Sequence, residues 1–143
     1  MSVSGFDHVA IPVADPEAMI RFYGALGFRV PELERFREED PPYFYVQFGD
    51  NKINMHTPRL WKKDAFTLRG PTARPGCGDF CFVWGGSEGS LRDALASAGA
   101  EIIEGPVPRA GGRGGGKAMG ASVYCRDPDR NLLEFIIYPD SSG

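Results

Sequence analysis

The sequence contains little cysteine and little histidine, with three cysteines and two histidines among its 143 residues. Cys77, Cys81 and Cys125 form neither an even set nor a Cys-x-x-Cys pair. This spacing argues against a disulfide framework and against a structural zinc knuckle. We therefore expect the three thiols to be small buried side chains.

Long apolar runs and an excess of positive charge are also missing. No apolar segment is long enough to span a bilayer, so no membrane partner is expected. The first residues show no basic region followed by an apolar stretch, so we expect a cytoplasmic protein without a signal peptide. A net charge of −3 argues against a nucleic-acid partner, because phosphate binding needs a basic surface.

The first half of the chain predicts the order β-α-β-β-β. Asp15-Pro16-Glu17 is typical of a helix start, with an acceptor at the N-cap and a proline in the first turn. Apolar residues then recur at helical spacing until Gly27, which is suited to ending a helix. The strands expected around this helix are Phe6–Val13, a segment from Phe28 towards Phe36, Tyr43–Phe48 and Ile53–Thr57.

The second half predicts the same order. Ser87 or Ser90 can cap a helix whose apolar stripe runs from Leu91 to Ala98 and closes at Gly99. The expected strands are Asp79–Trp84, Glu101–Val107, Ala118–Cys125 and Leu132–Tyr138.

The two halves are therefore interpreted as an internal repeat. Residues 5–57 and 77–139 form the modules, and residues 58–76, with three prolines and two glycines, join them. A module of this kind cannot bury its sheet alone, so we expect one domain over residues 1–143. In this alignment His8 matches Asp79 at an offset of 71 (79 − 8), and His56 matches Glu134 at an offset of 78 (134 − 56).

Ionisable residues thus stand on otherwise apolar strands at matched positions. Glu134 lies within Leu-Leu-Glu-Phe-Ile-Ile, where a bare carboxylate on an interior face needs a cation. The alternative is a set of ordinary structural or solvated residues, but it must explain several matched positions at once. Two imidazoles and one carboxylate leave metal positions open for a substrate. We predict a divalent metal on His8, His56 and Glu134, with Asp79 as either a fourth ligand or a turn cap.

Four stretches of the sequence resemble the vicinal oxygen chelate superfamily, which includes glyoxalase I, extradiol dioxygenases and bleomycin-binding proteins. They are Phe6–Val13, Phe22–Phe28, Glu104–Arg109 and Arg126–Glu134. The resemblance covers nearly the whole chain and is closest to the branch of glyoxalase-domain virulence proteins. It implies an α+β fold in which two βαβββ modules form a curved mixed sheet, a half-barrel around a metal cleft. It also places the metal ligands on the first and last strands of each module, at His8, His56, Asp79 and Glu134.

The resemblance implies a metal-dependent lyase or isomerase, similar to lactoylglutathione lyase, that chelates vicinal oxygens of a small substrate. Glu134 is the candidate base, because a carboxylate can accept a carbon-bound proton. An extradiol-type iron(II) dioxygenase is the second candidate, which the lack of a third histidine disfavours. The third is a non-catalytic small-molecule binding or resistance protein. Manganese, iron, nickel, cobalt and zinc all suit such ligands.

A glycine-rich segment, Gly111–Ala118, nearly matches a phosphate-binding loop. Alanine replaces the required Ser/Thr and a strand follows, so we expect no nucleotide site. The segment is either a surface hairpin or a lid that meets an anionic substrate. The candidate substrate-binding residues are Arg109, Arg113, Lys117, Tyr45 and Tyr124.

The expected partners are a small-molecule substrate and a second copy of the chain. A two-module chain has sheet edges and open faces to cover, which favours a homodimer. The resemblance implies the same, with ligands drawn either from one chain or from two.

Overall fold

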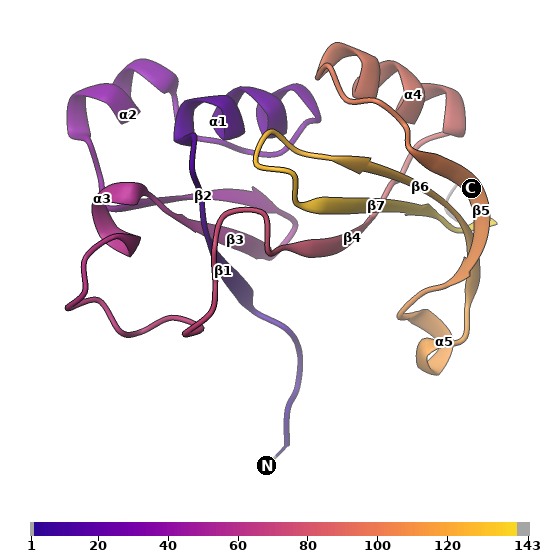
Figure 1. Ribbon diagram of the computed structural model, residues 1–143. Helices are drawn as coiled ribbons and strands as arrows, with labels where there is room; N and C mark the ends of the chain where they lie inside the picture. The colour runs from indigo at the N-terminus through magenta and orange to yellow at the C-terminus, as the bar shows by residue number, and fades with distance from the viewer. Residues whose placement is uncertain (1, 140–143) are drawn as a thin grey trace. The chain divides into compact units, whose positions relative to one another are not determined.

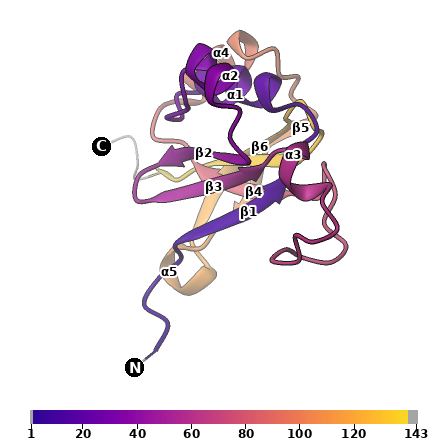
Figure 2. The same ribbon diagram turned by 90° about the vertical axis from the view of Figure 1, so that its left-hand side faces the viewer.

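The structure is a computed structural model that describes residues 2–139. The chain divides after Cys77 into two compact units, which we call the first module and the second module. Each contains a mixed β-sheet, with α1 and α2 on one face of the first sheet and α4 on one face of the second (Figure 1 and Figure 2). The α+β class predicted from the sequence is confirmed.

The first module has three strands in the order β1-β3-β2. β1 runs parallel to β3, and β2 runs antiparallel to it. The elements are β1 (His8–Pro12), α1 (Pro16–Ala25), α2 (Leu33–Glu39), β2 (Tyr43–Phe48), β3 (Asn51–His56) and α3 (Pro58–Trp61).

The second module repeats this plan with one more strand, in the order β4-β7-β6-β5. β4 is parallel to β7, and the other neighbours are antiparallel. The elements are β4 (Asp79–Val83), α4 (Glu88–Ser97), β5 (Glu104–Ala110), α5 (Arg113–Gly116), β6 (Met119–Arg126) and β7 (Leu132–Ile137). No helix among residues 2–139 is long and apolar enough to cross a membrane.

The long helices begin and end where the sequence predicts. The Asp15 carboxylate accepts a hydrogen bond from the amide of Ala18 at the start of α1, and the Ser87 hydroxyl does the same for Ser90 in α4, both at 3.1 Å. These bonds satisfy amides that a helix start leaves without a partner. Gly27 and Gly99 follow the two helices with φ of 96° and 75°, a region that favours glycine.

Each sheet buries the face that carries its helices. The rings of Phe36 in α2 and Phe44 in β2 pack edge to face with their centres 5.3 Å apart. Phe44 therefore lies on the helix-covered side of the first sheet. In the second, the Trp84 ring packs edge to face on Phe135, and its indole N–H donates to the Ser90 hydroxyl of α4. We call the opposite side of each sheet its far face.

Three segments differ from the sequence predictions. The strand expected from Phe28 towards Phe36 is wrong beyond Arg29, because residues 33–39 form helix α2. Leu33 and Phe36 are three residues apart and the Arg35–Glu39 ion pair has helical i,i+4 spacing, so this sequence supports a helix. Short helices also occur at 58–61, in the expected linker, and at 113–116, in the glycine-rich segment.

The fourth strand is the main difference between the modules. In the second module β5 pairs with β6 along most of its length. In the first module the corresponding segment makes one isolated bridge, Arg29 with Gln47, and then turns into α2.

Candidate functional site

The polar side chains predicted to carry chemistry lie on the far faces of the two sheets. Side chains alternate along a strand, and directly paired residues share a face. In the first module His8 pairs with Lys52, and the residue that pairs with Ala10 is Asn54. In the second module Asp79 pairs with Leu132. Cys81, two residues further along β4, pairs with Glu134.

This register corrects the matching of the modules. His8 and Asp79 are the first residues of β1 and β4, and their partners Lys52 and Leu132 differ by 80 positions (132 − 52). The same offset of 80 matches Glu134 with Asn54 (134 − 54). The sequence match of His56 with Glu134 is therefore wrong by two residues. The flanking residues support the corrected match, because Ile-Asn-Met in β3 corresponds to Leu-Glu-Phe in β7. The sequence prediction instead aligned the histidine with the glutamate.

The two histidines lie far apart along the first sheet. His8 is at the start of β1, and His56 pairs with Pro12, four residues further along. At about 3.3 Å per residue this is about 13 Å, a spacing that disfavours joint binding of one ion by both imidazoles. Asn54 lies only two residues from the position opposite His8, within reach of the same ligand.

His8 is arranged like a metal-binding histidine. Its Nδ1 lies 2.6 Å from a carboxylate oxygen of Asp7. Such a carboxylate fixes the orientation of an imidazole and leaves Nε2 as the nitrogen that can bind a ligand. The side chain is 43% exposed.

Asn54 carries an unusual amide oxygen. Its Oδ1 is buried and has no hydrogen-bond partner among the described residues. A buried oxygen without a partner costs about 1–3 kcal/mol, so proteins rarely keep one without a reason. An amide oxygen is also an acceptable ligand for hard divalent cations. Sequence reasoning missed this residue.

Glu134 occupies the matched position in the second module. It is half-buried, and its Oε2 accepts a hydrogen bond from the Ser122 hydroxyl at 2.6 Å. Glu134 pairs with Cys81 on one side and with Tyr124 on the other, so it stands in the middle of the sheet. The structure thus holds this carboxylate in one orientation on the far face.

The thiol of Cys81 is influenced by the charge of Glu134. Partial shielding from water raises the pKa of the Cys81 thiol to about 12, assisted by the Glu134 charge and a hydrogen bond to its carboxylate. The thiol therefore stays protonated at neutral pH and acts as a donor rather than as a nucleophile. The expectation that all three cysteines are buried is wrong, because Cys77 and Cys81 are exposed residues and only Cys125 is buried.

Arg109 and Tyr124, both predicted to bind substrate, lie together beside Glu134. Arg109 Nε donates to the Tyr124 hydroxyl at 3.0 Å, and Nη2 lies 3.2 Å from the carboxylate of Glu104. The hydrogen bond to Tyr124 raises the pKa of Arg109, and the Glu134 charge contributes in the same direction. A guanidinium is thereby held close to the candidate base, where it can bind an anionic group.

His56 lies at the other end of β3. Burial lowers the pKa of its imidazole, and the nearby Arg69 charge lowers it further. The ring meets Phe66 edge to face at 5.2 Å. His56 is thus a neutral imidazole near pH 7, able to bind a metal or accept a proton.

The other predicted substrate residues are not brought together. Tyr45 lies on the first sheet with the Lys52 ammonium 4.4 Å from its ring centre. Arg113 lies in α5 with its guanidinium 4.5 Å from the Tyr138 ring centre. Lys117 follows directly at the C-terminal end of α5. Their roles in substrate binding stay predictions.

The candidate metal ligands are divided between the modules. Among residues 2–139, no three His, Cys, Asp or Glu side chains are grouped to hold an ion. His8 with Asn54 and Asp79 with Glu134 are two matched pairs of donors, each on neighbouring strands. The donor types suit a divalent cation, and their joining in one site stays a prediction.

Comparison with known proteins identifies the family of this chain. The model of the glyoxalase/bleomycin resistance protein/dioxygenase superfamily matches residues 5–72. The glyoxalase domain-containing protein RDO1 of Mycosarcoma maydis is 34% identical over 99% of this chain and 72% of its own length. Virulence protein STM3117 of Salmonella typhimurium is 33% identical over 96% of this chain and 87% of its own length. The chain belongs to the glyoxalase/bleomycin resistance protein/dioxygenase superfamily.

Solved structures of this superfamily share the fold. The crystal structure of STM3117 has a TM-score of 0.77 at 32% identity, covering 96% of this chain and 99% of that one. A lactoylglutathione lyase from Agrobacterium tumefaciens has a TM-score of 0.65 at 18% identity, covering 96% of each chain. The second likeness shows the glyoxalase fold alone.

Proposed function

We propose that this chain is a metal-dependent enzyme of the glyoxalase type, a lyase or isomerase that acts on a small oxygenated substrate. One observation carries the proposal. Glu134 and Asn54 occupy matched positions on the far faces of two repeated sheets, one as an oriented carboxylate and the other as a buried oxygen without a partner. Ordinary structural residues do not require both features at once.

A divalent metal is part of this proposal, since superfamily members generally bind one. His8, Asn54, Asp79 and Glu134 are the ligands that the strand register favours, and His56 is the ligand that the sequence favoured. When bound, the ion would supply a Lewis acid that polarises the substrate's oxygens.

Glu134 is proposed as the proton acceptor. The Ser122 hydroxyl donates to one carboxylate oxygen, and the Cys81 thiol donates to the same carboxylate. These neutral donors orient the carboxylate without neutralising it, and so leave it able to accept a proton from carbon. Arg109 lies nearby, so we propose that the substrate carries an anionic group at that end.

Metal content tests the proposal without any substrate. We expect the purified chain to retain a divalent metal in elemental analysis, and Glu134→Gln to lower its occupancy at least tenfold. Glu88→Gln is the control, because Glu88 is an exposed acid on α4 that pairs with Arg92. Equal metal content in all three proteins would contradict a role for Glu134 in binding.

Asn54 and His56 provide the matched test of the ligand set. If the register-matched positions bind the ion, Asn54→Ala lowers the metal affinity and His56→Ala leaves it nearly unchanged. The reverse result would restore the sequence prediction. Circular dichroism of both variants confirms that they are folded.

Two activity assays separate the candidates within the superfamily. Isomerisation of the methylglyoxal–glutathione adduct, abolished in Glu134→Gln, supports the lyase or isomerase. Oxygen uptake with catechols after iron(II) loading would favour the extradiol-type dioxygenase instead. Tight binding of a small molecule by a metal-free protein without turnover would favour the non-catalytic binding protein.

A second copy of the chain is also proposed. β1 and β2 are the outer strands of the first sheet, and β4 and β5 are those of the second. Outer strands of this kind are commonly covered by association. Light scattering at several concentrations tests for the homodimer.

A further inference from the structure

Tyr124 stands beside the proposed base on the far face of the second sheet. It pairs directly with Glu134 across β6 and β7, so the two side chains share that face. The Cβ atoms of directly paired residues are about 4.5–5.5 Å apart. A small substrate that contacts the Glu134 carboxylate can therefore also contact the phenol of Tyr124.

The guanidinium of Arg109 is held against this phenol by three contacts. Its Nε donates to the Tyr124 hydroxyl at 3.0 Å, and Nη1 donates to the Pro108 carbonyl at 3.0 Å. Its Nη2 lies 3.2 Å from the carboxylate of Glu104. Each of the three nitrogens thus has a partner within the second module. The fixed fork of a guanidinium makes such an arrangement specific in direction.

The direction of the bond between Arg109 and Tyr124 decides what the phenol can do. A guanidinium only donates, so the phenol oxygen is the acceptor. The phenol keeps one hydrogen, and no acceptor for it is found among residues 2–139. That hydrogen is available to an oxygen atom of a bound molecule. The positive charge also polarises the O–H bond and makes the phenol a stronger donor.

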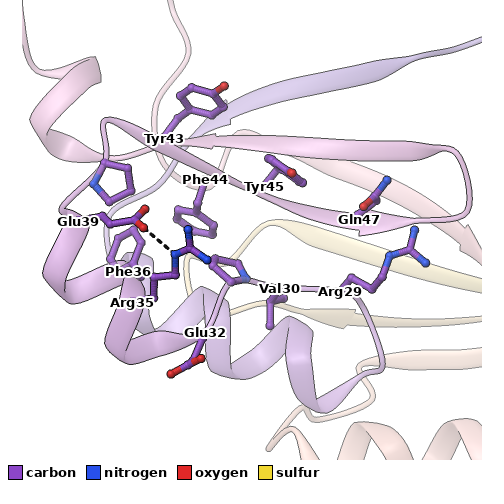
Figure 3. Close-up of a pocket in the computed structure, with 12 residues that line it drawn as sticks. Arg29, Val30, Glu32, Arg35, Phe36, Glu39, Tyr43, Phe44, Tyr45 and Gln47 are labelled. Carbon is purple, nitrogen blue, oxygen red and sulfur yellow. Dashed lines mark hydrogen bonds and ion pairs between the residues drawn. The ribbon is translucent and has the colours of Figure 1, made fainter.

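The matching tyrosine of the first module has different surroundings. Tyr45 pairs with Asn54 as Tyr124 pairs with Glu134. The Lys52 ammonium lies 4.4 Å from the centre of the Tyr45 ring. β2 is the outer strand here, and Tyr45 lines a pocket of about 440 Å³ between β2 and α2 (Figure 3). Among the described residues, a guanidinium bonded to a tyrosine hydroxyl therefore occurs only where β5 completes the sheet.

We propose that Tyr124 is a catalytic residue, the proton donor that acts opposite Glu134, with Arg109 as its positioning residue. This rests on the proposed function, in which Glu134 takes a proton from carbon. The electron pair of that C–H bond forms a carbon–carbon double bond, and the neighbouring carbonyl oxygen becomes negative. Tyr124 gives its phenolic proton to this oxygen, so a neutral enediol forms. The negative charge passes to the phenolate, where Arg109 stabilises it.

The second half of the isomerisation reverses both transfers. The Tyr124 phenolate takes the proton of the other enediol hydroxyl, and a carbonyl forms at the first carbon. Glu134 returns its proton to the second carbon. Both side chains regain their starting protonation, and protons and charge balance without a co-reactant.

A binding test requires neither turnover nor metal. Glu134→Gln imitates the base after it has taken a proton, so the chelator-treated variant should bind acetate beside Tyr124 more tightly than the wild-type chain does. Proton–nitrogen NMR follows the Arg109 Nε–H and the Tyr124 amide during titration into the millimolar range. We expect saturable shifts of both signals. The double variant Glu134→Gln, Tyr124→Phe should bind acetate about tenfold more weakly, because it lacks a hydrogen bond to a charged group.

Kinetics with the methylglyoxal–glutathione adduct test the catalytic role. Tyr124→Phe should lower kcat about a hundredfold with KM and metal content nearly unchanged. Arg109→Gln should lower kcat about tenfold, and should add little in the Tyr124→Phe background, because Arg109 acts through the phenol. Tyr43→Phe is the control, since it removes the hydroxyl of an exposed tyrosine on the first sheet and should leave kcat unchanged.

The outcomes separate this inference from the proposed function. An inactive wild-type chain whose acetate binding depends on Tyr124 would contradict the isomerase and support Tyr124 as a donor to an oxyanion. Full activity of Tyr124→Phe would overturn the inference and leave the isomerase intact. Acetate binding that ignores the Tyr124 hydroxyl, or that leaves the Arg109 Nε–H signal unmoved, would also overturn it. The Arg109 signal is read with Tyr124 in place, so this arm does not depend on how Tyr124→Phe folds.

Discussion

The two modules share an order of elements and a register, and they differ in what covers the last sheet edge. In the second module β5 completes the sheet, and its Arg109 lies beside Glu134. In the first module a single bridge at Arg29 replaces that strand, and α2 follows. A repeated fold has therefore kept matched polar positions on the far faces while changing its edges. The matched positions carry residues of the proposed site, and the last edges differ in how they are paired.

The largest effects are expected from matched core residues. Ile53 and Leu133 hold equivalent places in β3 and β7 and are 1% and 0% exposed. Substituting either by alanine should cost about 2–5 kcal/mol of unfolding free energy, because each leaves a cavity. Urea unfolding measures this, with Trp61 reporting on the first module and Trp84 on the second in single-tryptophan backgrounds. If the two modules form one domain, as the sequence predicts, both reporters should move together.

The contrary result would be informative. If Ile53→Ala shifts only the Trp61 signal, the modules unfold independently, and the repeat is two domains rather than one.

Substitutions in the turn that joins the last two strands of each module should differ more in their effect on stability than substitutions in the two cores. In the second module the buried Asp127 carboxylate accepts hydrogen bonds from the amides of Asp129 and Asn131 and from the Asn131 side chain. In the first module two residues, Gly49 and Asp50, make the turn. Asp127→Ala should therefore cost about 1–3 kcal/mol in urea unfolding. Asp50→Ala should cost less than about 0.5 kcal/mol. Equal losses would show that the buried network adds nothing.

Much of this plan is readable from the sequence, because local rules decide it. The Asp15 and Ser87 caps, the glycines after α1 and α4 and the runs of β-branched residues predict both modules with small errors at the ends. The helix at 33–39 was missed because its charged middle resembles a curled loop, and its helical signals are only the spacing of Leu33 and Phe36 and one i,i+4 ion pair, Arg35–Glu39. A fold family can also be recognised from short motifs.

The site is harder to predict because it depends on register across strands. His56 and Glu134 look equivalent when strands are aligned by their chemistry, but pairing with β1 and β4 makes Asn54 the equivalent residue. A shift of this size changes no pattern of apolar and polar residues, since side chains alternate with a period of two. The hydrogen bonds of Ser122, Cys81 and Arg109 link strands that are separated in sequence, so no local motif predicts them.

Helix caps test whether the modules are equivalent at a finer level. Asp15 and Ser87 each accept one amide hydrogen bond at 3.1 Å. Asp15→Ala and Ser87→Ala should therefore each cost about 1 kcal/mol. Replacing both should give the sum, because the two caps belong to different helices. Thermal unfolding measures the loss, and Ser87→Thr and Asp15→Asn should restore most of it. A cost confined to one module would break the equivalence of α1 and α4.

The smallest expected effect distinguishes the modules by pH, because the described second module contains no histidine. Burial and then the Arg69 charge lower the pKa of His56 from its ordinary value of 6.5. The unfolded chain therefore binds a proton at a higher pH than the folded chain does. The resulting stabilisation is complete above about pH 6.5 and is lost as the pH falls towards the folded pKa. In chelator-treated protein, an NMR titration of the imidazole should show a midpoint below 6.5. Arg69→Gln should raise that midpoint part of the way back, whereas Arg69→Lys keeps the charge and the low value. A midpoint unmoved by Arg69→Gln would leave burial as the sole cause.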